Sequence, residues 1–379
     1  MNILDYFDPV NFPDLTGNIA AGKYSIGPEI ADTTKKLTVS RMQDYDIAII
    51  GAPFEDSKYA GKTFSAADKI RKQLYCLSSL GEKIAIADLG NLKPAKSKKG
   101  TLMAIRDITD YLNAAKIVPV FIGGSQDLTA GICDAFRNKE FFTLSNIDAV
   151  LDVKKGVEKF SSTNYLSAIF KSLPNIFHFN LIGYQNHLVS EKLTGKYCEY
   201  GEYLRLGQLR DDFSLSEPLL RNADVISLDM GVVNYANAPG SGQKNPNGLR
   251  GEEVCQLARF AGISNNLKVF GLFELYPDED KNNITEKLAG EVIWYFLDGF
   301  ANKPDSEKKI IYKVDISGLE QPVIFLQEPV SDRWWFEIQS VTGKKILIAC
   351  SENEYLKAAN NEIPGRWLKF VQKMDSLSK

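Results

Sequence analysis

The chain has 379 residues, of which 44% are hydrophobic and 25% are charged, and its formal net charge at pH 7 is −3. These values are typical of a globular protein in water, and so small a charge excludes an argument for nucleic acid or an anionic membrane as a partner. No segment approaches the roughly 20 apolar residues that a membrane helix needs. The start of the chain, MNILDYFDPVNFPDL, is acidic and contains proline, unlike a signal peptide.

The cysteines are spread widely along the chain. They are Cys76, Cys133, Cys198, Cys255 and Cys350. Their number is odd and no two form a CxxC pair, so a disulfide framework is not expected. This usage favours a reducing compartment, and we predict a cytoplasmic protein with unpaired thiols.

Apolar runs of strand length alternate with segments of helical spacing between residues 44 and 300. The predicted strands are 44–53, 83–90, 117–124, 146–153, 176–184, 223–231 and 267–275, and the predicted helices include 66–77, 101–116, 251–264 and 284–300. Such alternation predicts an α/β fold with three layers, in which helices cover both faces of a mostly parallel sheet. Ligands bind such sheets at the carboxyl ends of the strands.

The composition changes after Pro304. The segments KKIIYKVDI, PVIFLQEP and WWFEIQ predict short strands, and EIPGRWLKFVQKM predicts a terminal helix. Three of the four tryptophans, Trp334, Trp335 and Trp367, lie in this part of the chain. We therefore predict an α/β domain over 1–304 and a small β-rich extension over 305–379 that packs on it.

Acidic residues follow several predicted strands. Asp148 and Asp152 lie in DAVLD, Asp229 lies in LDMG, and Glu274 lies in GLFELYP. A carboxylate in such a position can serve as a helix cap or a turn residue. It can also belong to a ligand site, because the carboxyl ends of parallel strands meet at one edge of the sheet.

Six segments, in order, resemble motifs of the ureohydrolase superfamily, which includes arginase, agmatinase and formiminoglutamase. IIGAPFED (49–56) is similar to the first strand and loop of that family, FIGGSQDLT (121–129) to its GGDHS motif, and IDAVLD (147–152) to its DAHxD motif. LDMGVVNYANAPGSGQKNPNGL (228–249) resembles the D-x-D motif with its APG loop. VFGLFELYPDED (269–280) and NITEKLAGEVIWYFL (283–297) resemble the last strand and the terminal helix.

The resemblance implies an arginase-like fold and hydrolysis of a guanidino or formimino carbon by a hydroxide bridging two manganese ions. The family holds these ions with two histidines and four aspartates. Here Asp148, Asp152 and Asp229 match, whereas Gln126 stands at the first histidine position. The family's guanidinium-binding glutamate is matched by Glu274.

Two other ligand positions are lost. Val150 stands where the family has its second histidine, and Gly231 stands where it has the second aspartate of D-x-D. Neither side chain can coordinate a metal, so a binuclear manganese centre is not expected. The remaining set, Asp148, Asp152, Asp229 and Gln126, offers only oxygen ligands and suits no ion or one hard cation such as Mg²⁺, Ca²⁺ or Mn²⁺.

The two histidines do not replace these ligands. His178 lies within a predicted strand and reads as a core residue, and His187 reads as a surface loop residue. Asp127 would become a ligand if the end of its strand were shifted by one residue; otherwise it belongs to the first turn of a helix. Lys154 and Lys155 are candidates for a counter-charge to the carboxylates.

Three functional hypotheses remain. The first is a catalytically inactive or impaired family member, a pseudoenzyme that binds a guanidino or formimino molecule or serves as a scaffold. The second is a divergent single-metal hydrolase of linear amidines. The third is a structural subunit that assembles with an active relative, since family members form trimers or hexamers. We expect a homo-oligomer, a trimer or a hexamer.

Overall fold

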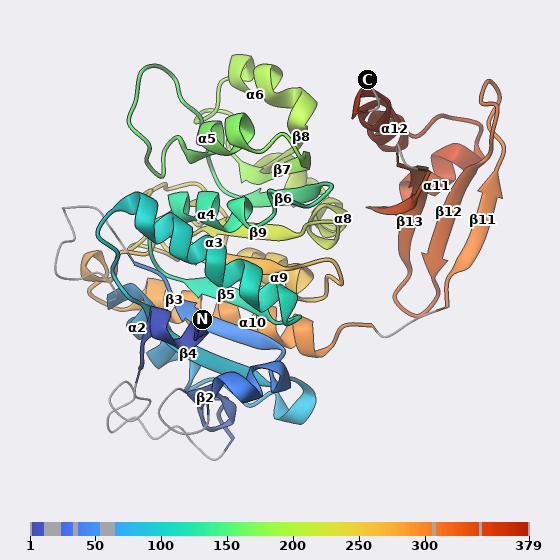
Figure 1. The fold of residues 1–379 in the computed structure, drawn as a ribbon. Helices are drawn as coiled ribbons and strands as arrows, with labels where there is room; N and C mark the ends of the chain where they lie inside the picture. The colour runs from blue at the N-terminus through green and yellow to red at the C-terminus, as the bar shows by residue number, and fades with distance from the viewer. Residues whose placement is uncertain are drawn as a thin grey trace.

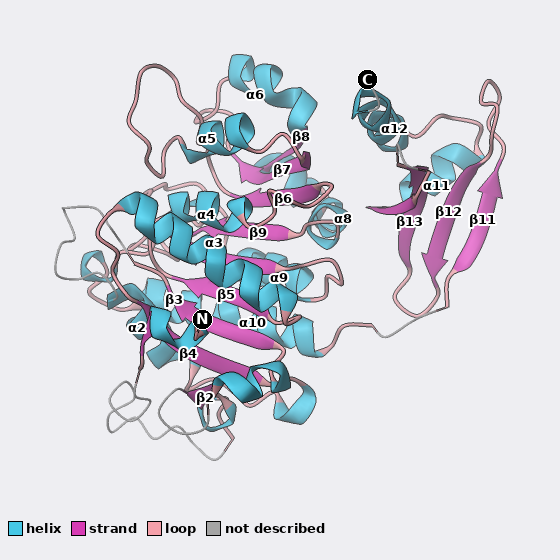
Figure 2. Cartoon of the chain, viewed as in Figure 1, coloured by secondary structure: helices cyan, strands magenta, loops and turns pink. Residues whose placement is uncertain are grey.

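The computed structural model of the chain describes residues 2–10, 24–32, 37–53, 65–304, 308–340 and 343–377. Two sheets organise it (Figures 1 and 2). The larger has the strand order β1-β4-β3-β5-β10-β9-β6-β7-β8, with β2 paired to β4, and the smaller has the order β11-β12-β13-β14.

The strands of the larger sheet are β1 (Phe7–Asp8), β2 (Ala31–Asp32), β3 (Ile47–Gly51), β4 (Ile86–Leu92), β5 (Val118–Ile122), β6 (Phe142–Ile147), β7 (Ile176–Tyr184), β8 (Gly201–Arg205), β9 (Val225–Asp229) and β10 (Val269–Phe273). Those of the smaller sheet are β11 (Ile310–Val314), β12 (Val323–Glu328), β13 (Arg333–Gln339) and β14 (Lys345–Cys350).

The helices are α2 (Ser65–Leu74), α3 (Lys98–Ala114), α4 (Thr129–Asp134), α5 (Tyr165–Ser172), α6 (Glu191–Tyr197), α7 (Leu206–Asp211), α8 (Ser216–Arg221), α9 (Gly251–Gly262), α10 (Ile284–Ala301), α11 (Glu352–Ala359) and α12 (Gly365–Leu377). Among the described strands of the larger sheet, β1 alone pairs antiparallel, so the predicted mostly parallel sheet is confirmed.

Helices cover both faces of the larger sheet, which confirms the three layers (Figure 1). Alternate side chains of one strand enter different cores because successive residues point to opposite faces. In β3, Ile47 and Ile49 pack with α2, α9 and α10, whereas Ala48 and Ile50 pack with α3 and α4. Apolar side chains therefore fill both faces of the sheet, and the acidic candidate residues lie at the ends of its strands.

The predicted strand at 146–153 is wrong. The structure places β6 at Phe142–Ile147, and Asp148 through Val153 form a loop. The strand escaped recognition because it carries buried polar residues: the Ser145 hydroxyl donates to the carbonyl of Leu219, and the Asn146 amide donates to the Tyr165 hydroxyl. The motif at 49–56 is described only to Pro53, so its last three residues lie outside the described chain.

The predicted extension forms the antiparallel sheet β11–β14 with α11 and α12, and it packs on the first domain. Arg221 at the end of α8 donates to the carbonyls of Trp334 and Cys350 at 3.0 and 3.2 Å. Phe177, near the start of β7, joins the extension's core. The extension therefore lies at the amino ends of β7, β8 and β9, opposite the edge that carries Asp148 and Asp229. The division at residue 304 stays a prediction, although different sheets lie on its two sides.

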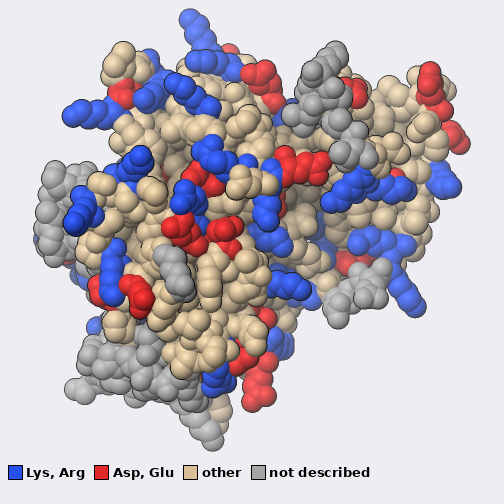
Figure 3. Space-filling view, in the orientation of Figure 1, with Lys and Arg blue, Asp and Glu red and all other residues tan. Residues whose placement is uncertain are grey.

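Charged side chains of both signs are interspersed on the face shown in Figure 3. Within the described ranges, no helix has the length and apolar character needed to cross a membrane.

Candidate metal and ligand site

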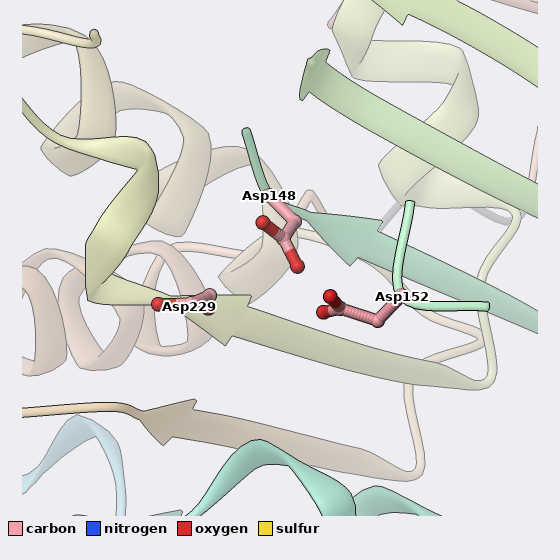
Figure 4. Close-up of side chains that lie close together, drawn as sticks. All are labelled: Asp148, Asp152 and Asp229. Carbon is pink, nitrogen blue, oxygen red and sulfur yellow. The ribbon is translucent and has the colours of Figure 1, made fainter. Parts of the chain in front are cut away.

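The candidate site lies where four neighbouring strands, β5, β10, β9 and β6, end together. Their parallel registers align these ends: Phe273 of β10 lies opposite Asp229 of β9, and Ile147 of β6 lies opposite Leu228. Asp148 therefore follows β6 beside the end of β9. The loop after β6 then turns back and brings Asp152 toward the same point (Figure 4).

Asp148, Asp152 and Asp229, hereafter the carboxylate cluster, lie close together, and the carboxylates of Asp148 and Asp152 face each other (Figure 4). Each offers one oxygen, and these oxygens lie within 4.8 Å of one another. All three side chains are buried. Three convergent carboxylate oxygens at this separation match the ligand type that hard divalent cations prefer.

Backbone groups hold two of these carboxylates. The Val150 amide donates to Asp148 Oδ1 at 3.0 Å, and the Gly231 amide donates to Asp229 Oδ1 at 2.5 Å. Asp148 Oδ2 is buried and has no hydrogen-bond partner within the described structure. An unsatisfied buried carboxylate oxygen is unfavourable, so this atom is available to a ligand.

Burial and mutual repulsion raise the pKa of every carboxyl in the cluster. Burial and then the charge of Asp152 hold the pKa of Asp148 well above its usual range. Burial and then Asp229 raise the pKa of Asp152 to about 8. Burial, followed by the charge of Asp148, also holds the pKa of Asp229 well above its usual range. Without a cation, the cluster therefore retains protons near neutral pH.

The cluster has no basic partner in direct contact: none of its carboxylates forms an ion pair within the part of the chain that the structure describes. Of the two lysines considered from the sequence, Lys155 contributes a weak attraction to Asp152, and both lysines are solvent-exposed. A buried group of like charges that lacks a counter-charge is typical of a ligand site.

Glu274 follows β10 directly and is buried beside the cluster. Its backbone adopts a left-handed conformation, with φ of 60°, and its amide donates to the carbonyl of Gly124 at 3.0 Å. Its carboxylate accepts from the Gln126 amide at 2.8 Å and from the Tyr276 hydroxyl. Burial, first of all, raises the pKa of Glu274. No ion pair to lysine or arginine forms among the described residues, and the Ser125 side chain is a third hydrogen-bond partner of this carboxylate.

Gln126 lies next to Glu274, but its side chain points to β9. Its Nε2 donates to the Ser227 hydroxyl at 3.3 Å, and its Oε1 is buried without a partner in the described chain. The neighbouring Asp127 is paired with Lys98 at 2.6 Å. Asp127 therefore does not take the place of Gln126, because its charge is already compensated.

The two histidines lie away from the cluster. His178 is fully buried in β7, where its Nε2 lies 3.0 Å from Glu202 and its Nδ1 lies 3.1 Å from Lys373. His187 is exposed in the loop after β7. Both sequence interpretations agree with these positions.

Among the described residues, the two positions that would supply a second ion carry no ligating side chain. Val150 and Gly231 offer no ligand atom, and Gln243 packs against Gly231: a Cβ added there would lie 3.1 Å from Gln243 Cβ and 2.9 Å from Asp229 Oδ1. An aspartate at 231 would therefore displace Gln243. Among the described residues, the three aspartates match the ligand type of a hard cation, and positions 150 and 231 do not match the family's ligand set for a second ion.

Sequence reasoning did not identify Gln243, Tyr165 or Asn146. Tyr165 and Asn146 carry no motif, and only the folded loop after β6 brings Tyr165 to the cluster. Gln243 follows the APG loop directly, so the absence of an aspartate at 231 could have directed attention to it.

Known proteins of one family resemble this chain. The family model described as the Arginase family matches residues 45–298. The formimidoylglutamase of Clostridium tetani is 22% identical over 245 residues, which cover 58% of this chain and 71% of that protein.

Solved structures share the fold. Trypanosoma cruzi formiminoglutamase with Mn²⁺ superposes with a TM-score of 0.62 at 18% identity, over 70% of this chain and 97% of that one. The agmatine ureohydrolase of Thermoplasma volcanium gives a TM-score of 0.56 at 20% identity, over 68% and 91%. The family model spans more than half of the chain, and the carboxylate cluster lies within the matched residues. The chain therefore belongs to the arginase family.

Proposed function

We propose that this arginase-family protein binds a single hard divalent cation at the carboxylate cluster and is impaired or inactive as a two-metal hydrolase. The observation that carries the proposal is the arrangement of three buried carboxylates within 4.8 Å of one another. Burying these charges without a counter-ion is costly, and one divalent cation would neutralise two of them. The side chains at 150 and 231 give a second ion no ligand.

Asp148, Asp152 and Asp229 would hold the cation, and water would complete its shell. Gln126 is a weaker candidate, because its amide nitrogen bonds to Ser227 and only its unpartnered Oε1 remains as a ligand. Once bound, such a cation supplies charge neutralisation and can polarise an oxygen or nitrogen atom of a ligand. An all-oxygen site without imidazole should bind it with modest affinity.

Glu274 would bind the cationic end of a guanidino or formimino molecule. A planar amidinium donates two parallel hydrogen bonds to a carboxylate. Glu274 already accepts from Gln126, Tyr276 and Ser125, so a bidentate ligand would replace one of these donors. In the absence of catalysis, this pocket would serve ligand binding or a scaffold role.

The alternative is hydrolysis of a linear amidine with one metal. The retained carboxylates and the similarity to formimidoylglutamases favour it. In either case we expect a homo-oligomer, a trimer or hexamer, which sedimentation would reveal. Mixed assembly with an active relative would appear as co-sedimentation of the two chains.

Calorimetric titration with Mn²⁺, Mg²⁺ and Ca²⁺ tests the cation site directly. We expect one site per chain in the wild type and none in Asp152→Ala. Asp127→Asn is the matched control, because it removes a neighbouring buried carboxylate that Lys98 already compensates, and it should leave affinity unchanged. Two tight sites per chain, or undiminished binding by Asp152→Ala, would contradict the proposal.

An activity assay separates the proposal from its alternative. Manganese-loaded wild type should release neither urea nor formamide from arginine, agmatine, guanidinobutyrate or formiminoglutamate, whereas release would establish the single-metal hydrolase. Metal analysis of Val150→His/Gly231→Asp/Gln243→Ala should find two Mn²⁺ per chain. The same variant with Gln243 retained should bind fewer, because Gln243 fills the required space.

A further inference from the structure

A tyrosine hydroxyl occupies part of the carboxylate that the proposed ligand would use. The Tyr276 phenol donates to Glu274 Oε2, the Gln126 amide donates to Oε1 at 2.8 Å, and the Ser125 side chain is the third partner. A carboxylate offers about four acceptor positions, and a planar amidinium needs two of them at once. An amidinium can therefore bind Glu274 through both oxygens only if one of the protein's donors leaves.

Two backbone hydrogen bonds hold Tyr276 beside the loop at 239–243. The Tyr276 amide donates to the Gly240 carbonyl at 2.6 Å, and the Gly242 amide donates to the Glu274 carbonyl at 3.1 Å. The tyrosine ring then lies against Gly242, because a Cβ added to Gly242 would lie 3.1 Å from Tyr276 Cε2 and 3.3 Å from Glu274 Oε2. The glycine leaves the space through which the ring reaches the carboxylate.

Of the three donors, Tyr276 is the one that a ligand can replace at the smallest cost. The Gln126 donor is a backbone amide, and its turn is fixed by the Glu274 amide, which donates to the Gly124 carbonyl at 3.0 Å. The Ser125 oxygen is attached directly to Cβ, so it stays with the same turn. The Tyr276 hydroxyl stands at the end of a half-buried ring, which can turn away by rotation about side-chain bonds while the backbone keeps its place.

We propose that Tyr276 is a specificity-determining residue of the ligand pocket, whose hydroxyl holds the position at Glu274 that the second N–H of an amidinium would take. This inference rests on the proposed guanidino or formimino pocket. A cation that makes a single contact can use the remaining acceptor position of Glu274, whereas a planar amidinium must first displace the phenol. The tyrosine therefore lowers the affinity for amidinium ligands relative to ligands that make one contact.

A supporting role for Tyr276 makes the opposite prediction. Burial raises the pKa of Glu274, and the hydrogen bond from Tyr276 opposes that rise. If this support decided the binding, the loss of the hydroxyl would leave more of the carboxyl protonated. Tyr276→Phe would then bind an amidinium more weakly than wild type.

The experiment is calorimetric titration of the full chain with methylguanidinium at pH 8, in chelator so that the cation site takes no part. Tyr276→Phe should bind about 10-fold more tightly than wild type, because only the wild type has to break a hydrogen bond to a charged group. Methylammonium, which lacks the planar pair of N–H groups, should gain less from the substitution. As a spectroscopic signature, methylguanidinium should perturb a tyrosine ultraviolet band in wild type and not in Tyr276→Phe.

The matched control is Tyr6→Phe. It removes another half-buried phenol that donates to a carboxylate, Asp107 Oδ2 at 3.3 Å, on the distant helix α3. Binding of methylguanidinium should be the same in this variant as in wild type.

The outcomes separate this inference from the proposed function. If wild type binds methylguanidinium and Glu274→Gln does not, while Tyr276→Phe binds no more tightly than wild type, the pocket stands and Tyr276 does not restrict it. An equal gain for methylammonium would also contradict the proposed selectivity. If neither wild type nor Tyr276→Phe binds methylguanidinium, or Glu274→Gln binds it equally well, the pocket itself fails and the inference fails with it. Tighter binding in Tyr276→Phe that is lost again in Tyr276→Phe/Glu274→Gln supports the inference.

Discussion

Buried charges have no opposite partner at one edge of the larger sheet and are paired at the other. At the carboxyl edge, three buried aspartates converge without an ion pair in the described chain. At the amino edge, where the extension packs, Arg366 bonds Glu202 at 3.0 Å, Glu202 bonds His178, and His178 contacts Lys373. Paired charges hold the extension on the first domain, whereas buried charges without a partner are typical of a ligand-binding site.

The largest effect expected at the amino edge follows from removing Arg366. Its side chain is 8% exposed, and it donates both to Glu202 and to the carbonyl of Ala349 in the extension. Arg366→Ala should lower the free energy of unfolding by about 3 kcal/mol, because it leaves a partly buried carboxylate without its guanidinium. Chemical denaturation measures this loss.

The control for Arg366 is Arg41→Ala. The pair between Arg41 and Asp44 is exposed, at 57% and 47% of their side-chain surfaces, and its loss should cost less than about 1 kcal/mol. Equal losses in the two variants would show that the charges at the amino edge do not fasten the extension.

The free energy of unfolding should fall at low pH because of groups at the same edge. Burial lowers the pKa of His178 to about 4 from its ordinary 6.5, so the folded chain holds this imidazole neutral. Between pH 6.5 and 4 the unfolded chain takes up a proton that the folded chain does not, and stability should fall by about 3 kcal/mol. Glu202 acts in the same direction: Arg366 and His178 outweigh the effect of burial and lower its pKa.

Unfolding measured across pH 4–7 tests this dependence. His178→Gln can keep an acceptor toward Lys373 and a donor toward Glu202 without titrating, so its stability should fall less over that interval. An unchanged slope in the variant would place the acid sensitivity at other groups.

Mutation at the carboxyl edge should raise the stability of the metal-free protein, whereas mutation at the amino edge lowers stability. Because the folded pKa of Asp152 is raised from 3.8 to about 8, the metal-free protein should lose stability as the pH rises between these values. At pH 7 the unfolded chain ionises Asp148 whereas the folded metal-free chain keeps it protonated, and this difference costs stability. Asp148→Asn removes that cost, so it should stabilise the metal-free protein by roughly 1–3 kcal/mol while abolishing cation binding. Thermal unfolding in chelator and in Mn²⁺ measures both effects. A destabilised metal-free variant would mean that the cluster is structural.

The sequence predicted the sheet, its flanking helices and the extension because their apolar periodicity is strong. It placed Asp148, Asp152 and Asp229 at one edge because parallel strands end together there. It failed at 146–153, where the buried polar side chains of Ser145 and Asn146 hide the strand before Asp148. A search for apolar periodicity misses such side chains. They can be buried in a strand only because residues distant in the sequence supply their hydrogen-bond partners.

Contacts between distant segments also explain what the sequence could not show about Glu274. The sequence left two hypotheses, a salt bridge to a basic residue or a ligand-binding carboxylate. The structure gives Glu274 hydrogen bonds from the Gln126 amide and the Tyr276 hydroxyl in place of a basic partner. These bonds depend on the turn after β5 and on the left-handed backbone at Glu274, and neither follows from local periodicity.

The smallest expected effect concerns this ligand carboxylate. If Glu274 binds an amidinium, then arginine, agmatine, guanidinobutyrate or formiminoglutamate should raise the melting temperature of the wild type by about 1 °C for each kcal/mol of binding linkage, given the length of this chain. Glu274→Gln preserves acceptor and shape but removes the charge, so it should lose this shift while folding normally. Glu279→Gln is a matched control, because Glu279 lies on the same loop and pairs with Lys244 at 2.8 Å. A shift that persists in Glu274→Gln would place the ligand elsewhere. If none of the four compounds changes the melting temperature, then Glu274 serves the hydrogen bonds that it already makes, and the scaffold role is what remains.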